Sequence, residues 1–228
     1  MPRLIYIHGY VEDPTIFDNL APLLPTESVL KITLQDEFAR WNPDDSTVNV
    51  SSLAAYLTKI YRITPADVII GHSMGGWIAA NLKAQTGCRA VLVSSYTDQR
   101  KVVAITRNVG IIWWLMKLGF VQSGAFANFA LKQYPFNESR ALHKSLIGNM
   151  TSQPSRYVYQ QLRVLFATPT TPPAASDVRI HTRPDNVLLF PDELCHETPG
   201  DHFNLVFHPR EVAAPILAFL EREVVGSR

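Results

Sequence analysis

The sequence lacks several features that would assign it to a specialised class of protein. Its 228 residues contain no dense run of Lys or Arg, and 21 basic residues against 20 acidic ones give a net charge of +1. A role in binding nucleic acid or an acidic membrane surface therefore has no electrostatic support. Internal repeats and low-complexity tails are also absent, and the length suits one α/β domain with a buried core.

Cysteines and long apolar runs are scarce. Cys88 and Cys195 are far apart and have no metal-ligand spacing, so reduced thiols in the cytoplasm are expected rather than a disulfide.

The start of the sequence, MPRLIYIHGY, lacks the charged segment, the long apolar segment and the cleavage site of a signal peptide. Arg107 and Lys117 interrupt the most apolar stretch, residues 102–121, whereas a spanning helix needs about 20 apolar residues. We therefore expect no membrane span, and a helix here that is buried on most sides or faces an apolar pocket.

Short apolar segments alternate with helical patterns in the first half of the chain. The candidate strands are residues 3–7, 29–34, 67–70 and 90–94. Helical spacing follows at residues 51–62, where Asn49 or Ser51 could cap the start, and at residues 74–86, which Gly87 closes. This alternation predicts right-handed crossovers and a parallel sheet.

The alternation breaks after the fourth strand. Residues 98–167 have a mostly helical and aromatic pattern, and a Pro-rich connector follows at residues 168–177. The further elements expected are a strand at 178–182, a short strand near 193–197, and a helix from about Pro209 that Pro215 kinks or delays.

The predicted fold is a single α/β domain over residues 1–228. It is a three-layer αβα sandwich with a mostly parallel sheet and a helical cap insertion at about residues 98–170. Ligands bind beyond the carboxyl ends of the strands in such sheets, so the insertion is expected to cover a pocket there. Nothing in the sequence specifies an oligomeric state.

A serine stands between glycines at the end of the third predicted strand. The segment VIIGHSMGGW contains Gly71, Ser73 and Gly75 in the pattern G-x-S-x-G, with a strand before it and a helix after it. Small neighbours let the backbones approach at a sharp turn, and the helix N-terminus there favours negative charge. Ser73 is therefore the candidate nucleophile, with close helix–strand packing by the glycines as the structural alternative.

A serine nucleophile needs a histidine base and an acid that orients the base. His202 lies between a Pro-Gly turn and the last predicted helix, and His196 and His208 are alternatives. The acids that follow the serine are Asp98, Asp177, Asp185, Asp192, Glu193 and Asp201. Asp98 and Asp185 both follow predicted strands, so both remain candidates.

The charge that develops on a carbonyl oxygen also needs two N–H donors. The Met74 amide directly follows the serine, and the Tyr10 amide lies in the loop after the first predicted strand. Gly9 permits the turn of that loop. His8 stands at its root and is expected to form structural hydrogen bonds rather than act as the base.

Four motifs in this order resemble those of the α/β-hydrolase superfamily. YIHGY resembles its oxyanion loop, and GHSMGG resembles its nucleophile elbow. IHTRPDNVL is similar to the acid-bearing segment I-H-G-x-x-D-x-V, with Thr182 where Gly is usual, and PGDHFNLV resembles the catalytic-histidine loop. The motifs span residues 5–207, and the last one also has a local likeness to thioesterases.

The resemblance implies Asp185 as the acid, His202 as the base, a helical cap and no cofactor. It also implies a compact member, because the chain starts at the first motif and the two antiparallel N-terminal strands common in the family are expected to be absent. We therefore expect a serine hydrolase that cleaves an ester or thioester of a small apolar molecule through an acyl-enzyme. The alternatives are C–C bond hydrolysis or perhydrolysis by the same triad, or a binding protein that kept the fold.

The predicted cap contains apolar side chains that could line a substrate pocket or simply pack the cap onto the core. They are Trp113, Trp114, Met116, Phe120, Phe126 and Phe129. No Arg or Lys stands where it would clearly bind a carboxylate or phosphate of the substrate.

Overall fold

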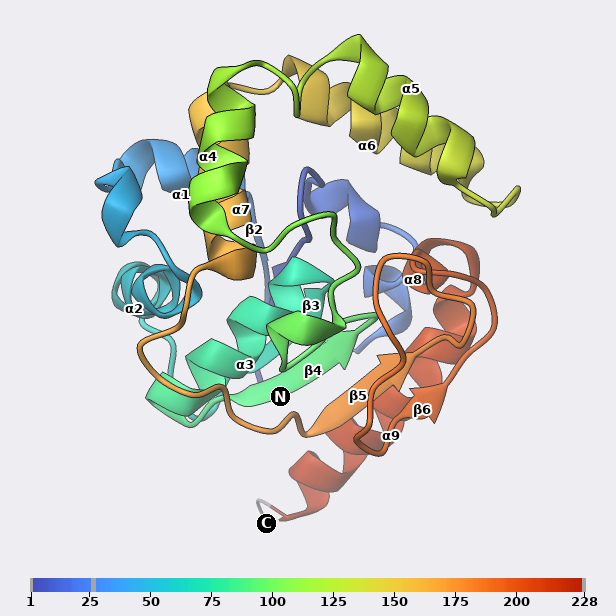
Figure 1. Cartoon of the computed structure of the whole chain (residues 1–228). Coiled ribbons are helices and arrows are strands. Elements are labelled where there is room, and N and C mark those ends of the chain that lie inside the picture. Colours follow the sequence, from blue (N-terminus) through green and yellow to red (C-terminus); the bar gives the residue numbers. More distant parts are fainter. Residues whose placement is uncertain (1, 26–27, 227–228) are drawn as a thin grey trace.

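The computed structural model describes residues 2–25 and 28–226 (Figure 1). Its strands form one sheet in the order β2-β1-β3-β4-β5-β6, and each neighbouring pair is parallel. The strands are β1 Leu4–Ile7, β2 Val29–Ile32, β3 Val68–His72, β4 Arg89–Val93, β5 Val178–His181 and β6 His196–Glu197. The parallel α/β sheet predicted from the sequence is confirmed.

Helices connect the strands. The α-helices are α1 Leu34–Trp41, α2 Val50–Tyr61, α3 Met74–Thr86, α4 Val109–Lys117, α5 Gly124–Gln133, α6 Arg140–Ser152, α7 Ser155–Phe166, α8 Asn204–Phe207 and α9 Pro209–Gly226. Short 3-10 helices are η1 Pro14–Phe17, η2 Ala21–Leu23, η3 Asp45–Thr47 and η4 Gln99–Lys101.

The sheet separates two apolar cores because successive strand residues point to opposite faces. Ile5 and Ile7 of β1 pack with side chains of α1, α2 and α3, including Trp77. Leu4 and Tyr6 pack on the other face with side chains of η1 and α9. Both faces are thus covered by helices, as a buried parallel sheet requires, and the three-layer sandwich follows.

Helices α4 to α7 lie in the segment between β4 and β5, which we call the helical insertion (residues 98–170). In Figure 1, α4, α5 and α6 lie above the sheet, whereas α7 packs against α2, α3 and α4. Ile112 of α4 and Met150 of α6 belong to the same apolar core as Leu4 and Tyr6. The insertion therefore shares its core with the sheet.

Several local expectations are corrected or sharpened. The second strand ends at Ile32, and Leu34 instead opens α1, which the sequence analysis did not predict. The apolar stretch 102–121 forms a helix only at Val109–Lys117, and one side of it is exposed, with Trp114 61% exposed. The last helix begins at Pro209 and continues through Pro215.

The start of α2 is set by a capping box. The Asn49 side chain accepts from the Ser52 backbone N–H, and the Ser52 hydroxyl accepts from the Asn49 N–H. Two N–H groups at the start of the helix are thereby satisfied. Asn49 rather than Ser51 is the cap, and Gly87 closes α3 with a φ of 74° as expected.

Candidate active site

Ser73 lies at the sharp turn between β3 and α3. Its backbone has φ 52° and ψ −121°, a conformation that costs a non-glycine residue free energy. A Cβ added to Gly71 would lie 2.3 Å from the Gly75 backbone, and one added to Gly75 would lie 1.9 Å from the Ile7 carbonyl oxygen. Glycine is therefore required on both sides of Ser73, and the turn places this serine on the wall of a cavity.

His202 and Asp185 form a buried pair. The His202 Nδ1 and Asp185 Oδ2 atoms are 2.7 Å apart, and the two side chains are 3% and 1% exposed. Asp185 Oδ1 accepts from the backbone N–H groups of Val187 and Leu188. Burial raises the pKa of Asp185, but His202 and these N–H donors together hold it below the usual value. The carboxylate is thus charged and keeps a proton on Nδ1, which leaves Nε2 as the basic nitrogen.

His202 and Ser73 come from segments that meet beside the turn. The rings of His72 and His202 have centroids 5.0 Å apart, and Ser73 directly follows His72. Within the described part of the chain, no hydrogen bond joins the Ser73 hydroxyl to the His202 ring. Such bonds are often long without substrate and shorten when it binds.

The alternative acid and bases have other partners. Asp98 caps η4 and pairs with Arg100 at 2.7 Å. His196 is exposed in β6, and the His208 ring faces Glu138. The geometry therefore favours Asp185 over Asp98 as the partner of a histidine near Ser73.

The remaining acids are also engaged away from His202. Asp177 pairs with Lys83, Asp192 with Lys101, and Glu193 with Arg179. Asp201 accepts from the Phe203 N–H and the Ser139 hydroxyl. Each of these carboxylates thus has a structural partner of its own.

Two backbone amides near Ser73 have no partner among the described residues. Among the described residues, the N–H groups of Tyr10 and Met74 have no hydrogen-bond acceptor. A Cβ on Gly9 would lie 2.9 Å from the Ser73 Cβ, so the Gly9–Tyr10 backbone passes close to the serine. Both predicted donors are therefore available to an oxygen bound there.

His8 has the structural position that the sequence analysis expected. Its Nε2 accepts from the Leu34 N–H at 3.1 Å, and its Nδ1 faces the Gly9 carbonyl oxygen at 2.9 Å. Burial lowers the pKa of His8, so the ring is neutral with its proton on Nδ1.

Thr182 stands at the position of the acid segment where glycine is usual, and the structure explains why a side chain fits there. Its backbone does not adopt a positive φ, so a side chain is tolerated. The buried Thr182 hydroxyl donates to the Gly200 carbonyl oxygen at 2.5 Å. The threonine thus links the Asp185 loop to the His202 loop.

Sequence reasoning missed two buried residues next to the candidate nucleophile. Glu12 and His72 are 4% and 0% exposed, and Glu12 Oε2 lies 3.0 Å from His72 Nδ1. The available signal was weak: an acid in the loop after β1, and a histidine at the variable position of the serine motif.

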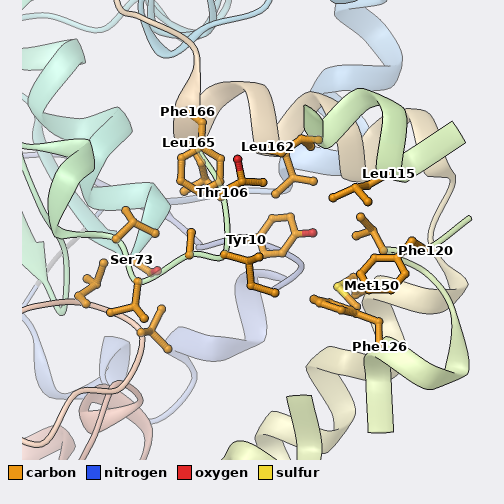
Figure 2. Close-up of a pocket in the computed structure, with 18 of the residues that line it drawn as sticks. Tyr10, Ser73, Thr106, Leu115, Phe120, Phe126, Met150, Leu162, Leu165 and Phe166 are labelled. Atoms are coloured by element: carbon orange, nitrogen blue, oxygen red, sulfur yellow. The ribbon is translucent and has the colours of Figure 1, made fainter. Parts of the chain in front are cut away.

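A cavity of about 320 Å³ opens beside Ser73 (Figure 2). Figure 2 shows Ser73 at one end, Phe120 and Met150 at the other, and the Tyr10 ring between them. None of the described residues that line it is charged, and those with a hydroxyl group are Ser73, Tyr10, Tyr96 and Thr106. The cavity is suited to an uncharged, largely apolar group.

Only some of the expected apolar residues of the insertion line this cavity. Phe120 and Phe126 do so, whereas Trp113 and Met116 line a separate surface groove. Trp114 and Phe129 are exposed. Sequence could not distinguish these positions, because helical spacing gives a face of the helix but not what that face meets.

The described residues include no group of three or more His, Cys, Asp or Glu side chains that could hold a metal ion. The two thiols, Cys88 and Cys195, are unpaired in this part of the chain. No described helix is both long enough and apolar enough to cross a membrane.

Comparison with known proteins identifies the family of this chain. Residues 4–225 match the model of a family described as the alpha/beta hydrolase family. The chain belongs to the alpha/beta hydrolase family. No curated protein matches the sequence of this hydrolase significantly.

Solved structures of similar fold include several hydrolases. An esterase from Thermogutta terrifontis, solved with malate, has 13% identity and a TM-score of 0.68 over 97% of this chain and 90% of its own. An enol-lactonase from Burkholderia xenovorans LB400 has 10% identity and a TM-score of 0.68 over 96% and 91%. A hydrolase from Oleispira antarctica has 12% identity and a TM-score of 0.67 over 97% and 91%. At these identities the likeness shows the shared fold, and the family supports a hydrolase of a small molecule.

Because of His181, we predict that the free energy of unfolding of this alpha/beta hydrolase depends on pH. Neither ring nitrogen has a hydrogen-bond partner among the described residues, although Nε2 lies 3.7 Å from Asp185 Oδ2. Burial outweighs the attraction of Asp185 and lowers the pKa of His181 from 6.5 to about 4. Between these pH values the unfolded chain binds one more proton than the folded one. The free energy of unfolding should therefore fall as the pH falls through this window, by at most about 3 kcal/mol.

His181→Leu should flatten this slope, because leucine carries no proton. Urea unfolding at several pH values from 7 to 4 would measure the slope in both proteins. Parallel curves for the two proteins would contradict the prediction.

Proposed function

We propose that the protein is a serine hydrolase that cleaves a carboxylic ester or thioester through an acyl-enzyme. The observation that carries the proposal is the buried 2.7 Å contact of His202 with Asp185 beside a strained, cavity-lining Ser73. A triad is recognised by such geometry rather than by sequence position. The fold family supports a hydrolase but leaves the bond and the substrate open.

In the proposed mechanism, the Ser73 Oγ attacks the substrate carbonyl carbon while His202 Nε2 takes its proton. The imidazolium that forms is stabilised by the charged Asp185 on the other ring nitrogen. The carbonyl oxygen becomes negative and accepts from the amides of Tyr10 and Met74. The N-terminus of α3, at which Ser73 stands, also favours this charge.

The tetrahedral intermediate then collapses. His202 gives its proton to the leaving alcohol or thiol, and the acyl group remains on the Ser73 oxygen. Water, activated by His202 in the same way, attacks the acyl carbonyl and releases the acid. Each step uses groups that this chain supplies, with no cofactor.

We propose an apolar acyl or alcohol group as the occupant of the cavity. A volume of about 320 Å³ is at the lower end for small-molecule sites, so the group is small. A charged group would lose its hydration there without gaining a partner, because the described lining residues are uncharged.

We also propose that the protein lies in the cytoplasm. The basis is that its cysteines are few and that they are unpaired in the described part of the chain.

Ser73→Ala tests the nucleophile. A fluorophosphonate probe should label the wild-type protein at Ser73, and the alanine variant should give no labelling, because the probe bonds to an activated serine oxygen. Mass spectrometry of the labelled peptide would identify the site. Labelling that persists in the variant would overturn the assignment, and an unlabelled wild type would favour a non-catalytic binding protein.

Asp185→Asn tests the acid. The variant should lose about three to four orders of magnitude in kcat, because an amide no longer holds the proton on His202 Nδ1. Asp98→Asn is the matched control and should stay within about twofold of wild type, since Asp98 pairs with Arg100 at the surface. Steady-state rates on one ester would decide, and the reverse order of effects would move the acid to Asp98.

A substrate panel tests the bond and the apolar group. For p-nitrophenyl esters, kcat/KM should rise by about fourfold per added methylene until the cavity is full, because each buried methylene is worth about 0.8 kcal/mol. A succinyl ester, which carries a charge, should be slower than the uncharged ester of equal length. Faster turnover of a diketone than of any ester or thioester would instead favour C–C bond hydrolysis.

A further inference from the structure

A buried acid and a buried histidine lie directly beneath the proposed nucleophile. Glu12 follows β1 by five residues, and His72 is the last residue of β3. Glu12 Oε2 accepts from the Gly9 N–H at 2.5 Å and lies 3.0 Å from His72 Nδ1. The carboxylate thus connects the loop that holds the Tyr10 amide to the residue before Ser73.

The other side of the His72 ring reaches the catalytic-histidine loop. His72 Nε2 lies 2.9 Å from the His202 carbonyl oxygen. A carbonyl oxygen only accepts, so this ring nitrogen carries a proton. One imidazole therefore bridges two loops. It joins the first loop of the chain to the loop of His202, although 130 residues separate His72 from His202.

The pair is charged in the folded protein. Burial lowers the pKa of His72, but the adjacent Glu12 outweighs it and raises that pKa. Burial raises the pKa of Glu12, but His72 and the Gly9 N–H outweigh it and lower that pKa. The other titratable groups that interact with the pair include His8, His181, Asp185 and His202. A doubly protonated His72 thus donates to both partners.

A buried ion pair contributes little to stability, because desolvation cancels most of the attraction between the charges. An apolar pair of the same volume could fill the space, but it would leave the Gly9 N–H and the His202 carbonyl oxygen without these partners. What the ion pair provides is direction: each N–H and each carboxylate oxygen fixes one segment at a defined distance and angle. The three segments fixed in this way are those that supply the Tyr10 amide, Ser73 and His202.

We propose that Glu12 and His72 are positioning residues, which hold the oxyanion-binding loop and the His202 loop in register with Ser73. The proposal rests on the serine hydrolase function proposed above. A displacement of about 1 Å of a reacting group can lower the rate about 100-fold, so the loss of either link should act on kcat. Neither side chain lines the cavity, so KM should change little.

Two substitutions of His72 separate the two links. The amide nitrogen of asparagine reaches about the position of Nδ1, and that of glutamine reaches about the position of Nε2. His72→Asn therefore keeps the donor to Glu12 and loses the link to His202. His72→Gln keeps the link to His202 and leaves the Glu12 carboxylate without its partner, which the double variant Glu12→Gln/His72→Gln relieves.

We expect His72→Asn and Glu12→Gln each to lower kcat and the rate of fluorophosphonate labelling by about 10- to 100-fold, with KM within about threefold of wild type. The double amide variant should recover at least part of the loss seen in His72→Gln. Counting labelled molecules at saturation corrects each rate for any unfolded fraction.

Glu37→Gln is the matched control. Glu37 is 1% exposed and accepts from the hydroxyls of Tyr56 and Tyr61, away from the cavity residues. This variant should lower the melting temperature and leave kcat and KM unchanged. If His72→Asn and Glu12→Gln behave like Glu37→Gln, with lower stability but kcat per labelled molecule within about threefold of wild type, the pair is merely structural and the proposal is wrong. Failure of the function itself would differ, because the wild type would not be labelled at Ser73.

Discussion

The strained backbone of Ser73 is the constraint around which the rest of the site is arranged. A serine with φ 52° and ψ −121° persists only where its surroundings leave the chain no alternative. Here β3 is paired on both sides, α3 packs against β1, β3 and β4, and Gly75 lies against the Ile7 carbonyl. The large apolar cores on both faces of the sheet supply the free energy that maintains the turn.

The parallel sheet brings distant segments to the same place. The loops after β1, β3 and β5 all leave the sheet at its carboxyl edge, so Gly9, Ser73 and Asp185 become neighbours although the sequence separates them widely. Buried polar links join these loops to one another and to the loop of His202. They include Glu12 with His72, His72 with the His202 carbonyl, Asp185 with the His202 ring, and Thr182 with Gly200. Because each link joins two segments, the position of each loop depends on more than its own local sequence.

The difference between local patterns and contacts between distant loops explains what the sequence could and could not predict. The parallel sheet and the turn at Ser73 follow from local patterns, and the structure confirms them. The local pattern left the cap of α2 open between Asn49 and Ser51, and the structure has Asn49. The acid could be narrowed to Asp98 or Asp185 from the sequence alone, because both follow strands. The resemblance to the family implied Asp185, and the 2.7 Å contact between Asp185 and His202 in the assembled sheet supports that choice.

Other features had no local signal strong enough to predict them. Helix α1 is short and follows β2 after one residue, so its pattern merged with that of the strand. The aromatic residues of α4 were expected to line a pocket or pack in the core, yet Trp114 is mostly exposed. Glu12 was overlooked because a single acid in a loop looks like a solvated residue until a tertiary partner, here His72, buries it.

The charged side chains near Ser73 are buried, and they are separate from the apolar side chains that line the cavity. The side chains of Asp185, Glu12 and His72 are at most 3% exposed, and none of them is among the described residues that line the cavity. An apolar substrate that fills this cavity would displace water from the space around Ser73. The attraction between the developing negative charge and the Tyr10 and Met74 amides would then act in a medium of low dielectric constant, where it is much stronger than in water. In the proposed mechanism, the exclusion of water therefore links substrate binding in the cavity to stabilisation of the transition state at the turn.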